Sequence, residues 1–211
     1  MEEKELSLGL GTTTVGIVCK DGLVLAADKR AGGGIIVDKR AKKVHKLTDN
    51  MAVTIAGVAS DAQLIIKLVS AEIRLLEIRK ERQSTTKEAA NLLSGIVYHN
   101  IRRPSMIPGI SHFILAGKDE TGFHIFDIYP DGSLSDCIDF LSSGSGSVMA
   151  YGVLETLWKK DLSIQEGIQL AVKCINAAIQ RDMNSGDGID ILTVTKEGVK
   201  FVLQKELNNK L

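Results

Sequence analysis

A threonine run near the N-terminus contains the residues of this sequence that are best suited to chemistry. Gly11 is followed by Thr12, Thr13 and Thr14, and then by the apolar residues 15–19. The simplest interpretation is the start of a β-strand, because threonine is β-branched and suits extended backbone. The other interpretation is that the Gly11–Thr12 bond is cut. Thr12 would then carry a hydroxyl nucleophile together with a free α-amino group as its base.

Most other catalytic and ligand-binding patterns are missing from the sequence. No H-E-x-x-H or C-x-x-C pair is present, so the scattered histidines do not have metal-ligand spacing. The residues around Ser145 do not form a G-x-S-x-G elbow, and no phosphate-binding or dinucleotide-binding glycine loop occurs. We therefore expect no metal and no organic cofactor. The four histidines are His45, His99, His112 and His124.

The composition is that of an ordinary globular protein with one sizeable core. The chain has 211 residues, and 26 basic residues balance 26 acidic ones, so no basic excess favours nucleic acid or an anionic membrane. No apolar run approaches the length of a membrane span, and the acidic first residues do not form a secretory signal. Three widely spaced cysteines suggest reduced thiols, so we expect a cytoplasmic protein. They are Cys19, Cys137 and Cys174.

The hydrophobic pattern predicts strands, two helices, more strands, two further helices and two last strands. Hairpin signals such as Asp21-Gly22 join neighbouring strands, so the sheets should be largely antiparallel. Helices that arrive in pairs do not fit βαβ crossovers, which favours a four-layer αββα sandwich of the α+β class. Loops are expected at 31–34 and 142–147. Strands are expected at 13–20, 23–28, 43–47, 51–58, 112–117, 122–129, around 137–138, and at 189–195 and 199–203.

Start signals and apolar periodicity place the four helices. Capping boxes predict helix starts at Ser60-x-x-Gln63, Thr85-x-x-Glu88 and Ser163-x-x-Glu166, and the third helix should run to Trp158. The second helix should stop near Arg103-Pro104. In the first helix one apolar stripe is expected to face the core. That stripe consists of Leu64, Leu68, Ala71, Leu75 and Ile78.

Six short motifs in this order resemble the proteasome β subunits of the archaeal type, a group of N-terminal-nucleophile hydrolases. They are Gly-Thr-Thr-Thr-Val-Gly-Ile, Ala-Ala-Asp-Lys-Arg, Lys-Lys-Val, Thr-Ile-Ala-Gly-x-x-x-Asp-Ala-Gln, Gly-Ser-Gly-Ser-x-x-x-Tyr-Gly-Val-Leu-Glu and Arg-Asp-x-x-Ser-Gly. The resemblance extends from Gly11 to about Phe201. It implies the same four-layer sandwich that the element order predicts, and it implies a threonine peptidase.

The resemblance also implies a role for each site residue. Thr12 would be the nucleophile and its freed α-amine the base, since such an amine has a pKa of roughly 7.7–8.0. Asp28 would position Lys43, whose charge favours the deprotonated nucleophile, although the adjacent Lys42 is the alternative. Gly57 would supply an oxyanion-binding N–H, unless it only forms a bend. Ser145, Asp182 and Ser185 would hold the amine and a water. Ser145 could instead cap a helix, and the other two could simply be a polar helix end.

Domain boundaries and specificity follow from the same resemblance. Residues 1–11 would be a propeptide that the protein removes itself, and 12–211 a single catalytic domain. Side chains of the substrate would enter a pocket that includes Ala31, Gly32, Ile55 and Ala59. The pocket residues are uncharged, which suggests cleavage after hydrophobic residues. Gly32 stands where relatives often have threonine, and we expect extra loop flexibility there.

Assembly is likewise an implication of the resemblance. Stacked heptameric β rings would lie between rings of α subunits, a regulatory ATPase would act through the α ring, and unfolded polypeptides would be the substrates. One alternative is the two-ring bacterial peptidase, which also begins Thr-Thr and has an ATPase ring as partner. Another is a non-catalytic ring subunit, although such subunits usually lose the threonine, lysine or aspartate.

Overall fold

The computed structural model of the protein describes residues 11–32 and 35–207. The predicted leader therefore lies outside the described residues, apart from Gly11, which is the last residue of that leader. Residues 33–34 of the loop predicted at 31–34 lie outside them as well, as do residues 208–211.

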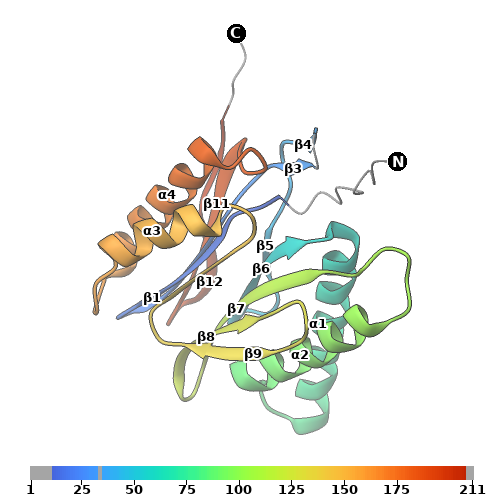
Figure 1. The fold of residues 1–211 in the computed structure, drawn as a ribbon. Helices are drawn as coiled ribbons and strands as arrows, with labels where there is room; N and C mark the ends of the chain where they lie inside the picture. Colours follow the sequence, from blue (N-terminus) through green and yellow to red (C-terminus); the bar gives the residue numbers. More distant parts are fainter. Residues whose placement is uncertain (1–10, 33–34, 208–211) are drawn as a thin grey trace.

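Two five-stranded antiparallel sheets form the centre of the fold (Figure 1). The first sheet has the order β10-β1-β2-β11-β12, so that β2 pairs with β11 although they are far apart in the sequence. The second sheet has the order β5-β6-β7-β8-β9. The strands of the first sheet are β1 (Thr14–Cys19), β2 (Gly22–Asp28), β10 (Phe140–Ser143), β11 (Gly188–Thr195) and β12 (Gly198–Glu206). Those of the second are β5 (Val44–Lys46), β6 (Met51–Gly57), β7 (Ser111–Asp119), β8 (Gly122–Ile128) and β9 (Leu134–Cys137).

A pair of helices covers the outer face of each sheet (Figure 1). Helices α1 (Ala59–Lys80) and α2 (Thr86–Arg102) pack on the second sheet, and α3 (Ser147–Leu157) and α4 (Ile164–Arg181) pack on the first. The predicted four-layer sandwich is confirmed. Its element order follows the predicted alternation of strands and helix pairs.

Three hydrophobic clusters fill the three interfaces between these four layers. One joins α1 and α2 to the second sheet and includes Ile65 and Phe113. Another joins α3 and α4 to the first sheet and includes Ile17 and Cys174. The third lies between the sheets and includes Ile114. Full burial of such a side chain stabilises the fold by about 1.5–3 kcal/mol, so these layers hold the strand ends in fixed positions.

Two of the three predicted capping boxes are present. Thr85 and Glu88 exchange side-chain and backbone hydrogen bonds at the start of α2, and Ser163 and Glu166 do so at the start of α4. The box predicted at Ser60 is wrong, because α1 begins after Val58 and has no side-chain cap. Helix α2 ends at Arg102, just before the Arg103-Pro104 pair, as predicted.

The apolar stripe predicted for α1 is also wrong. Leu64, Leu68, Leu75 and Ile78 are exposed, with 74% of Ile78 accessible, and Ala71 is exposed as well. The helix has apolar residues on two faces, and periodicity alone cannot tell which face the sheet covers. The buried stripe consists of Ala62, Ile65, Val69 and Ile73.

Both predicted loops contain strand residues. Ala31 and Gly32 form β3 (Ala31–Gly32), which pairs with β4 (Ile36–Asp38) in a small antiparallel ribbon. Ser142 and Ser143 belong to β10, where Ser143 pairs with Thr14. Short polar segments lack the alternation that reveals a strand, so only pairing with β1 and β4 identifies them.

No helix within residues 11–32 and 35–207 is long and apolar enough to cross a membrane. Cys19 and Cys174 are buried, and Cys137 is half-buried. Burial raises the pKa of each of these thiols to about 12.

Candidate active site

Thr12 lies two residues before the start of β1, at one end of the first sheet, and is buried, with only 5% of it accessible. Antiparallel pairing of β1 with β2 brings the end of β2 beside the threonine run. The backbone N–H of Asp28 donates to the Thr13 carbonyl over 3.2 Å, and the Thr13 N–H donates to the Asp28 carboxylate over 2.9 Å. The register of one hairpin therefore places the Asp28 carboxylate next to Thr12.

Lys43 joins this carboxylate from the second sheet. Its Nζ lies 2.8 Å from Asp28 Oδ1, and both side chains are almost fully buried. The adjacent Lys42 is exposed, so the structure resolves the choice of which lysine faces Asp28 in favour of Lys43. The backbone N–H groups of Arg30 and Gly186 donate to the other carboxylate oxygen, which fixes its orientation.

The charge of Lys43 depends on its neighbours. Burial lowers the pKa of the Lys43 ammonium from its ordinary value of 10.5. The charge and hydrogen bond of Asp28 oppose that effect, with a smaller attraction from Asp182 and a repulsion from Arg30. A buried cation is costly unless a carboxylate pairs with it, so the two side chains depend on each other.

The Gly11–Thr12 peptide faces this lysine. The Thr12 hydroxyl donates to the Gly11 carbonyl oxygen over 2.5 Å, and Lys43 Nζ lies 3.4 Å from the same oxygen. A hydroxyl group and an ammonium group thus lie beside one carbonyl group. A cation near a carbonyl oxygen stabilises the negative charge that develops there when a nucleophile adds to the carbon.

Three further predicted residues form a hydrogen-bonded network on the other side of Thr12. The Thr12 N–H donates to Ser145 Oγ over 3.2 Å, and Ser145 and Ser185 each donate to Asp182 Oδ2 over 2.6 Å. Asp182 is the C-cap residue of α4, directly after Arg181. Ser145 is not a helix cap, because Gly146 occupies the N-cap position of α3. The structure thus brings together residues from the β10–α3 and α4–β11 connections.

Gly57 and the predicted pocket residues lie on the remaining side. Gly57 has φ +112°, and a Cβ there would lie 2.2 Å from the Ile110 carbonyl oxygen, so a side chain cannot be accommodated. Gly57, Thr12 and Lys43 line a pocket of about 530 Å³. Three of the predicted pocket residues also line it, namely Ala31, Ile55 and Ala59, whereas Gly32 does not.

The comparison with known proteins identifies the family. A family model described as "Proteasome subunit" matches residues 9–194. The chain belongs to the proteasome subunit family.

Three archaeal relatives named "Proteasome subunit beta" are similar over most of their length. The protein of Ferroglobus placidus is 45% identical over 188 residues, which are 89% of this chain and 88% of the relative. That of Archaeoglobus profundus is 45% identical over 95% of this chain and 92% of the relative. That of Methanocaldococcus vulcanius is 43% identical over 95% of this chain and 89% of the relative. These relatives support a proteasome β subunit.

Several residues that support the site of this proteasome subunit were not predicted from the sequence. Thr13 contacts Ser185 through its hydroxyl over 2.7 Å. Arg30 binds Asp187 over 2.7 Å and donates to the Met183 carbonyl over 2.9 Å, which anchors the connection that carries Ser185. The signal was available for Arg30, because it lies in the Ala-Ala-Asp-Lys-Arg motif. No local pattern identifies its partner, which is 157 residues away.

His45 was not predicted as a site residue either. It appeared as one of four scattered histidines, but it lines the pocket beside Thr12, together with Gln63 and charged residues such as Asp38 and Arg40. Its ring contacts the Lys42 carbonyl over 3.0 Å. Burial lowers the pKa of His45, and the Lys42 carbonyl opposes the shift. The pocket therefore has apolar side chains on part of its wall and polar ones on the rest.

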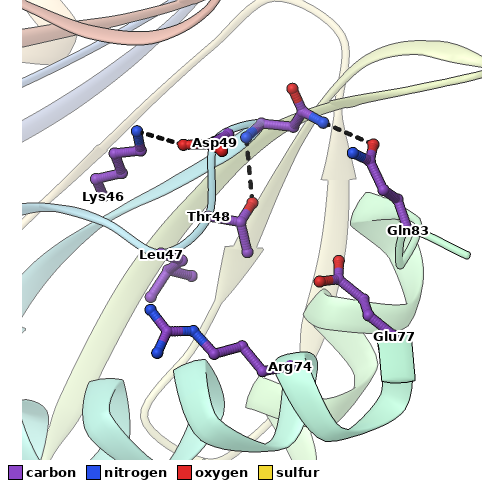
Figure 2. Close-up of a pocket in the computed structure, with 8 residues that line it drawn as sticks. Lys46, Leu47, Thr48, Asp49, Arg74, Glu77 and Gln83 are labelled. Atoms are coloured by element: carbon purple, nitrogen blue, oxygen red, sulfur yellow. Dashed lines mark hydrogen bonds and ion pairs between the residues drawn. The ribbon is translucent and has the colours of Figure 1, made fainter. Parts of the chain in front are cut away.

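A different pocket of this subunit, of about 490 Å³, lies between the β5–β6 turn and α1 (Figure 2). Figure 2 shows the Lys46–Asp49 ion pair and the hydrogen bond between Asn50 and Gln83 at its edge. None of the predicted site residues lines it. Its walls are mostly polar, and its lysine, Lys46, pairs with Asp49.

Proposed function

We propose that this chain is the catalytic β subunit of a proteasome core particle and acts as a threonine endopeptidase. The observation that carries the proposal is the arrangement around one carbonyl group. The Thr12 hydroxyl and Lys43 Nζ both lie within 3.4 Å of the Gly11 carbonyl oxygen, and Asp28 holds the lysine. A nucleophile, a cation and a buried carboxylate at one peptide bond are the components that acyl transfer requires.

The first reaction of the proposed enzyme is cleavage of its own Gly11–Thr12 bond. In the uncut chain the nitrogen of Thr12 is an amide and cannot act as a base. Thr12 Oγ would lose its proton and add to the Gly11 carbonyl carbon, the C–N bond would break, and that proton would end on the departing nitrogen, which leaves an ester and a free amine. Water would then hydrolyse the ester, so that the leader ends in a carboxylate. Lys43 stabilises the negative charge on the Gly11 oxygen in the first step.

The freed α-amine then serves as the base for other peptide bonds. It accepts the Thr12 hydroxyl proton while the oxygen attacks the substrate carbonyl, and it returns that proton to the leaving amine. The N–H of Gly57 is proposed to bind the oxyanion. The Ser145–Asp182–Ser185 network would orient the amine and the water that releases the product. In the uncut chain the same nitrogen already contacts Ser145.

The proposed substrates are unfolded polypeptides, which the enzyme would cut into short peptides. Ala31, Ile55 and Ala59 give part of the pocket an apolar surface, which supports cleavage after hydrophobic residues. The chemistry of this set of residues requires no cofactor. We further propose that residues 1–11 are a propeptide and that 12–211 form the catalytic domain.

The proposed assembly consists of stacked heptameric β rings between rings of α subunits, in the cytoplasm. A regulatory ATPase ring would contact the α ring and deliver substrates. Support comes from the relatives, which are named proteasome β subunits and are similar over most of their length.

The test is to co-express the chain with proteasome α subunits and to compare wild type with Thr12→Ala and Thr14→Ala. The wild-type subunit should lose the leader and begin at Thr12, as intact mass spectrometry would show, and it should hydrolyse peptides. Thr12→Ala should assemble, keep its leader and have no peptidase activity. Thr14 is a matched control in the same run, because its hydroxyl contacts Ser143 and not the Gly11 carbonyl. Thr14→Ala should remain active.

Three results would contradict the proposal. Full activity of Thr12→Ala would exclude Thr12 as the nucleophile. An active particle with an intact leader would show that the freed α-amine of Thr12 is not the base. Assembled but inert wild-type particles would indicate a structural ring subunit. Assembly without α subunits into two rings would indicate the bacterial type of peptidase.

A further inference from the structure

A second pocket lies beside the threonine site, on the other side of Gly57. It has a volume of about 270 Å³, and its walls include Gly57, Ile110, His112, Pro130 and Ser145. Most of this lining is apolar or backbone. None of the roles proposed above uses Ile110, His112 or Pro130.

This second pocket is continuous with the proposed active site. Ala56 and Gly57 line both pockets, and Gly57 has no side chain that could separate them. Ser145 lines the second pocket, and its Oγ accepts a hydrogen bond from the Thr12 nitrogen over 3.2 Å. A polypeptide bound at Thr12 therefore has a hollow on each side of the bond that would be cut.

A fixed imidazole gives the second pocket its polar wall. His112 Nε2 lies 2.6 Å from Oδ1 of the buried Asp127, and a carboxylate only accepts hydrogen bonds, so Nε2 carries a proton. The Tyr129 ring packs against the imidazole with the ring centres 5.1 Å apart. By strand alternation, His112 points to the same side of the sheet as Ile114, which belongs to the cluster between the sheets. These contacts hold the ring in place at the end of that layer.

We propose that the second pocket receives the side chain of the residue that follows the cleaved bond, and that it selects apolar side chains of medium size over acidic ones. The inference rests on the proposed function. The pocket of about 530 Å³ is lined by Gly11, which precedes the bond in this chain, by Thr12 and by the predicted pocket residues Ala31, Ile55 and Ala59, and we assign it to the residue before the cut. Neighbouring side chains of an extended chain point in opposite directions, so the next residue faces the hollow across Gly57.

The walls determine the expected preference. Ile110 and Pro130 offer apolar contacts, whereas the His112–Asp127 pair has no net positive charge with which to bind a carboxylate. An acidic side chain would lose its hydration without gaining a cation, which is unfavourable. One or two methylene groups in such a pocket change the rate by about tenfold or more.

The experiment uses internally quenched peptides and the particle that is active in the test above. One set varies only the residue after the cleaved bond, among Ala, Leu, Phe and Asp, and a second set varies only the residue before it. The variants are Ile110→Trp, which fills the pocket, and Ile110→Ala, which widens it. The backbone groups of Ile110 make the hydrogen bonds to Val58 and Pro108, so either substitution preserves them.

Wild type should cleave the Leu peptide of the first set about tenfold faster than the Asp peptide. Ile110→Trp should reduce the Leu-to-Ala rate ratio by about tenfold, and Ile110→Ala should favour residues larger than Leu. Rate ratios within the second set should stay as in wild type. Ala59→Val, in the pocket of about 530 Å³, should change the rate ratios within the second set and leave those within the first set as in wild type.

An active particle whose Leu-to-Ala ratio is the same in wild type, Ile110→Trp and Ile110→Ala would overturn this assignment and leave the proposed function intact. The assignment would also be overturned if the Ile110 variants changed only the rate ratios within the second set. If Ile110→Trp does not assemble, Ile110→Ala decides alone. A wild-type particle that cleaves none of the peptides would instead refute the proposed function, on which this inference depends.

Discussion

Lys43 Nζ and the Gly11 carbonyl oxygen lie 3.4 Å apart, although 32 positions separate the two residues in the sequence. The same ammonium lies 2.8 Å from the Asp28 carboxylate, which is buried and bound by three backbone N–H groups. The lysine therefore connects a fixed anion in the first sheet with the peptide bond that is proposed to be cut. Its position depends on the packing of one sheet on the other.

Replacement of Lys43 by Met should lower both leader removal and peptidase activity by a factor of about 10²–10³, the usual effect of removing one electrostatic contact from a transition state. Asp28 keeps its three backbone donors, so the fold should persist. Lys39 lies four positions before Lys43 and is exposed, which makes Lys39→Met the control. Intact mass and peptide hydrolysis measure the two effects. Equal activity of both variants would exclude a role for Lys43.

Gly57→Ala should destabilise the protein by at least about 2 kcal/mol, because φ +112° is strained for alanine. The new Cβ would also lie 2.2 Å from the Ile110 carbonyl oxygen. Peptidase activity should be lost as the Gly57 N–H moves. A Cβ added to Gly95 in α2 would meet no atom within 4 Å, so Gly95→Ala should be neutral or stabilise by about 0.5–1 kcal/mol. Denaturant unfolding compares them, and a Gly57→Ala protein as stable as wild type would contradict this explanation.

Peptides that end in Leu or Tyr before the cleaved bond should react faster than peptides that end in Arg or Glu. Ala31, Ile55 and Ala59 provide the apolar part of the pocket for this residue. Fluorogenic peptides with one leaving group and different final residues measure the preference. Faster hydrolysis after Arg or Glu would show that the polar residues on the same wall, among them His45, control the specificity.

Asp119 should make stability depend on pH in the acidic range. Burial raises the pKa of its carboxyl, but hydrogen bonds from Thr121 and Thr86 have a larger, opposite effect, so that the pKa is lowered to about 2. Because the folded pKa lies below the ordinary value of 3.8, the stabilisation is present above that value and is lost as the pH falls through about 2. Asp119→Asn should cost about 1 kcal/mol near neutral pH, after allowance for solvent screening.

The measurement for Asp119 is denaturant unfolding of wild type and Asp119→Asn near neutral pH and again near pH 2. The difference between them should shrink in acid, because part of the Asp119 carboxyl of wild type is then protonated and, like Asn, carries no charge. Asp136 is exposed on β9, and Asp136→Asn should change stability little at either pH. A loss that is the same at both pH values would show that the carboxylate charge is not the cause.

Local patterns in the sequence were sufficient to predict most of the helices and strands. The capping boxes at Thr85 and Ser163 depend on neighbouring residues, which interact in the same way in any fold that contains them. The predicted hairpin between β1 and β2 is present as well, but its two-residue loop is Lys20-Asp21 and not Asp21-Gly22, because Gly22 pairs with Cys19. The prediction of the buried stripe on α1 was wrong because it depends on distant residues. Leu64 and Ile65 are both apolar neighbours on one helix, and only contact with the second sheet determines that Ile65 is buried.

The sequence by itself determined the element order, the four-layer sandwich and the set of residue types that the proposed chemistry needs. The tertiary structure decided which of those residues meet. Strand pairing places Asp28 beside the threonine run, and sheet packing chooses Lys43 over its exposed neighbour Lys42. The contacts of Arg30 with Asp187 and of Ser145 with Thr12 join residues 157 and 133 positions apart. Such contacts arise only when the core has packed, because burial of the apolar layers brings distant segments together.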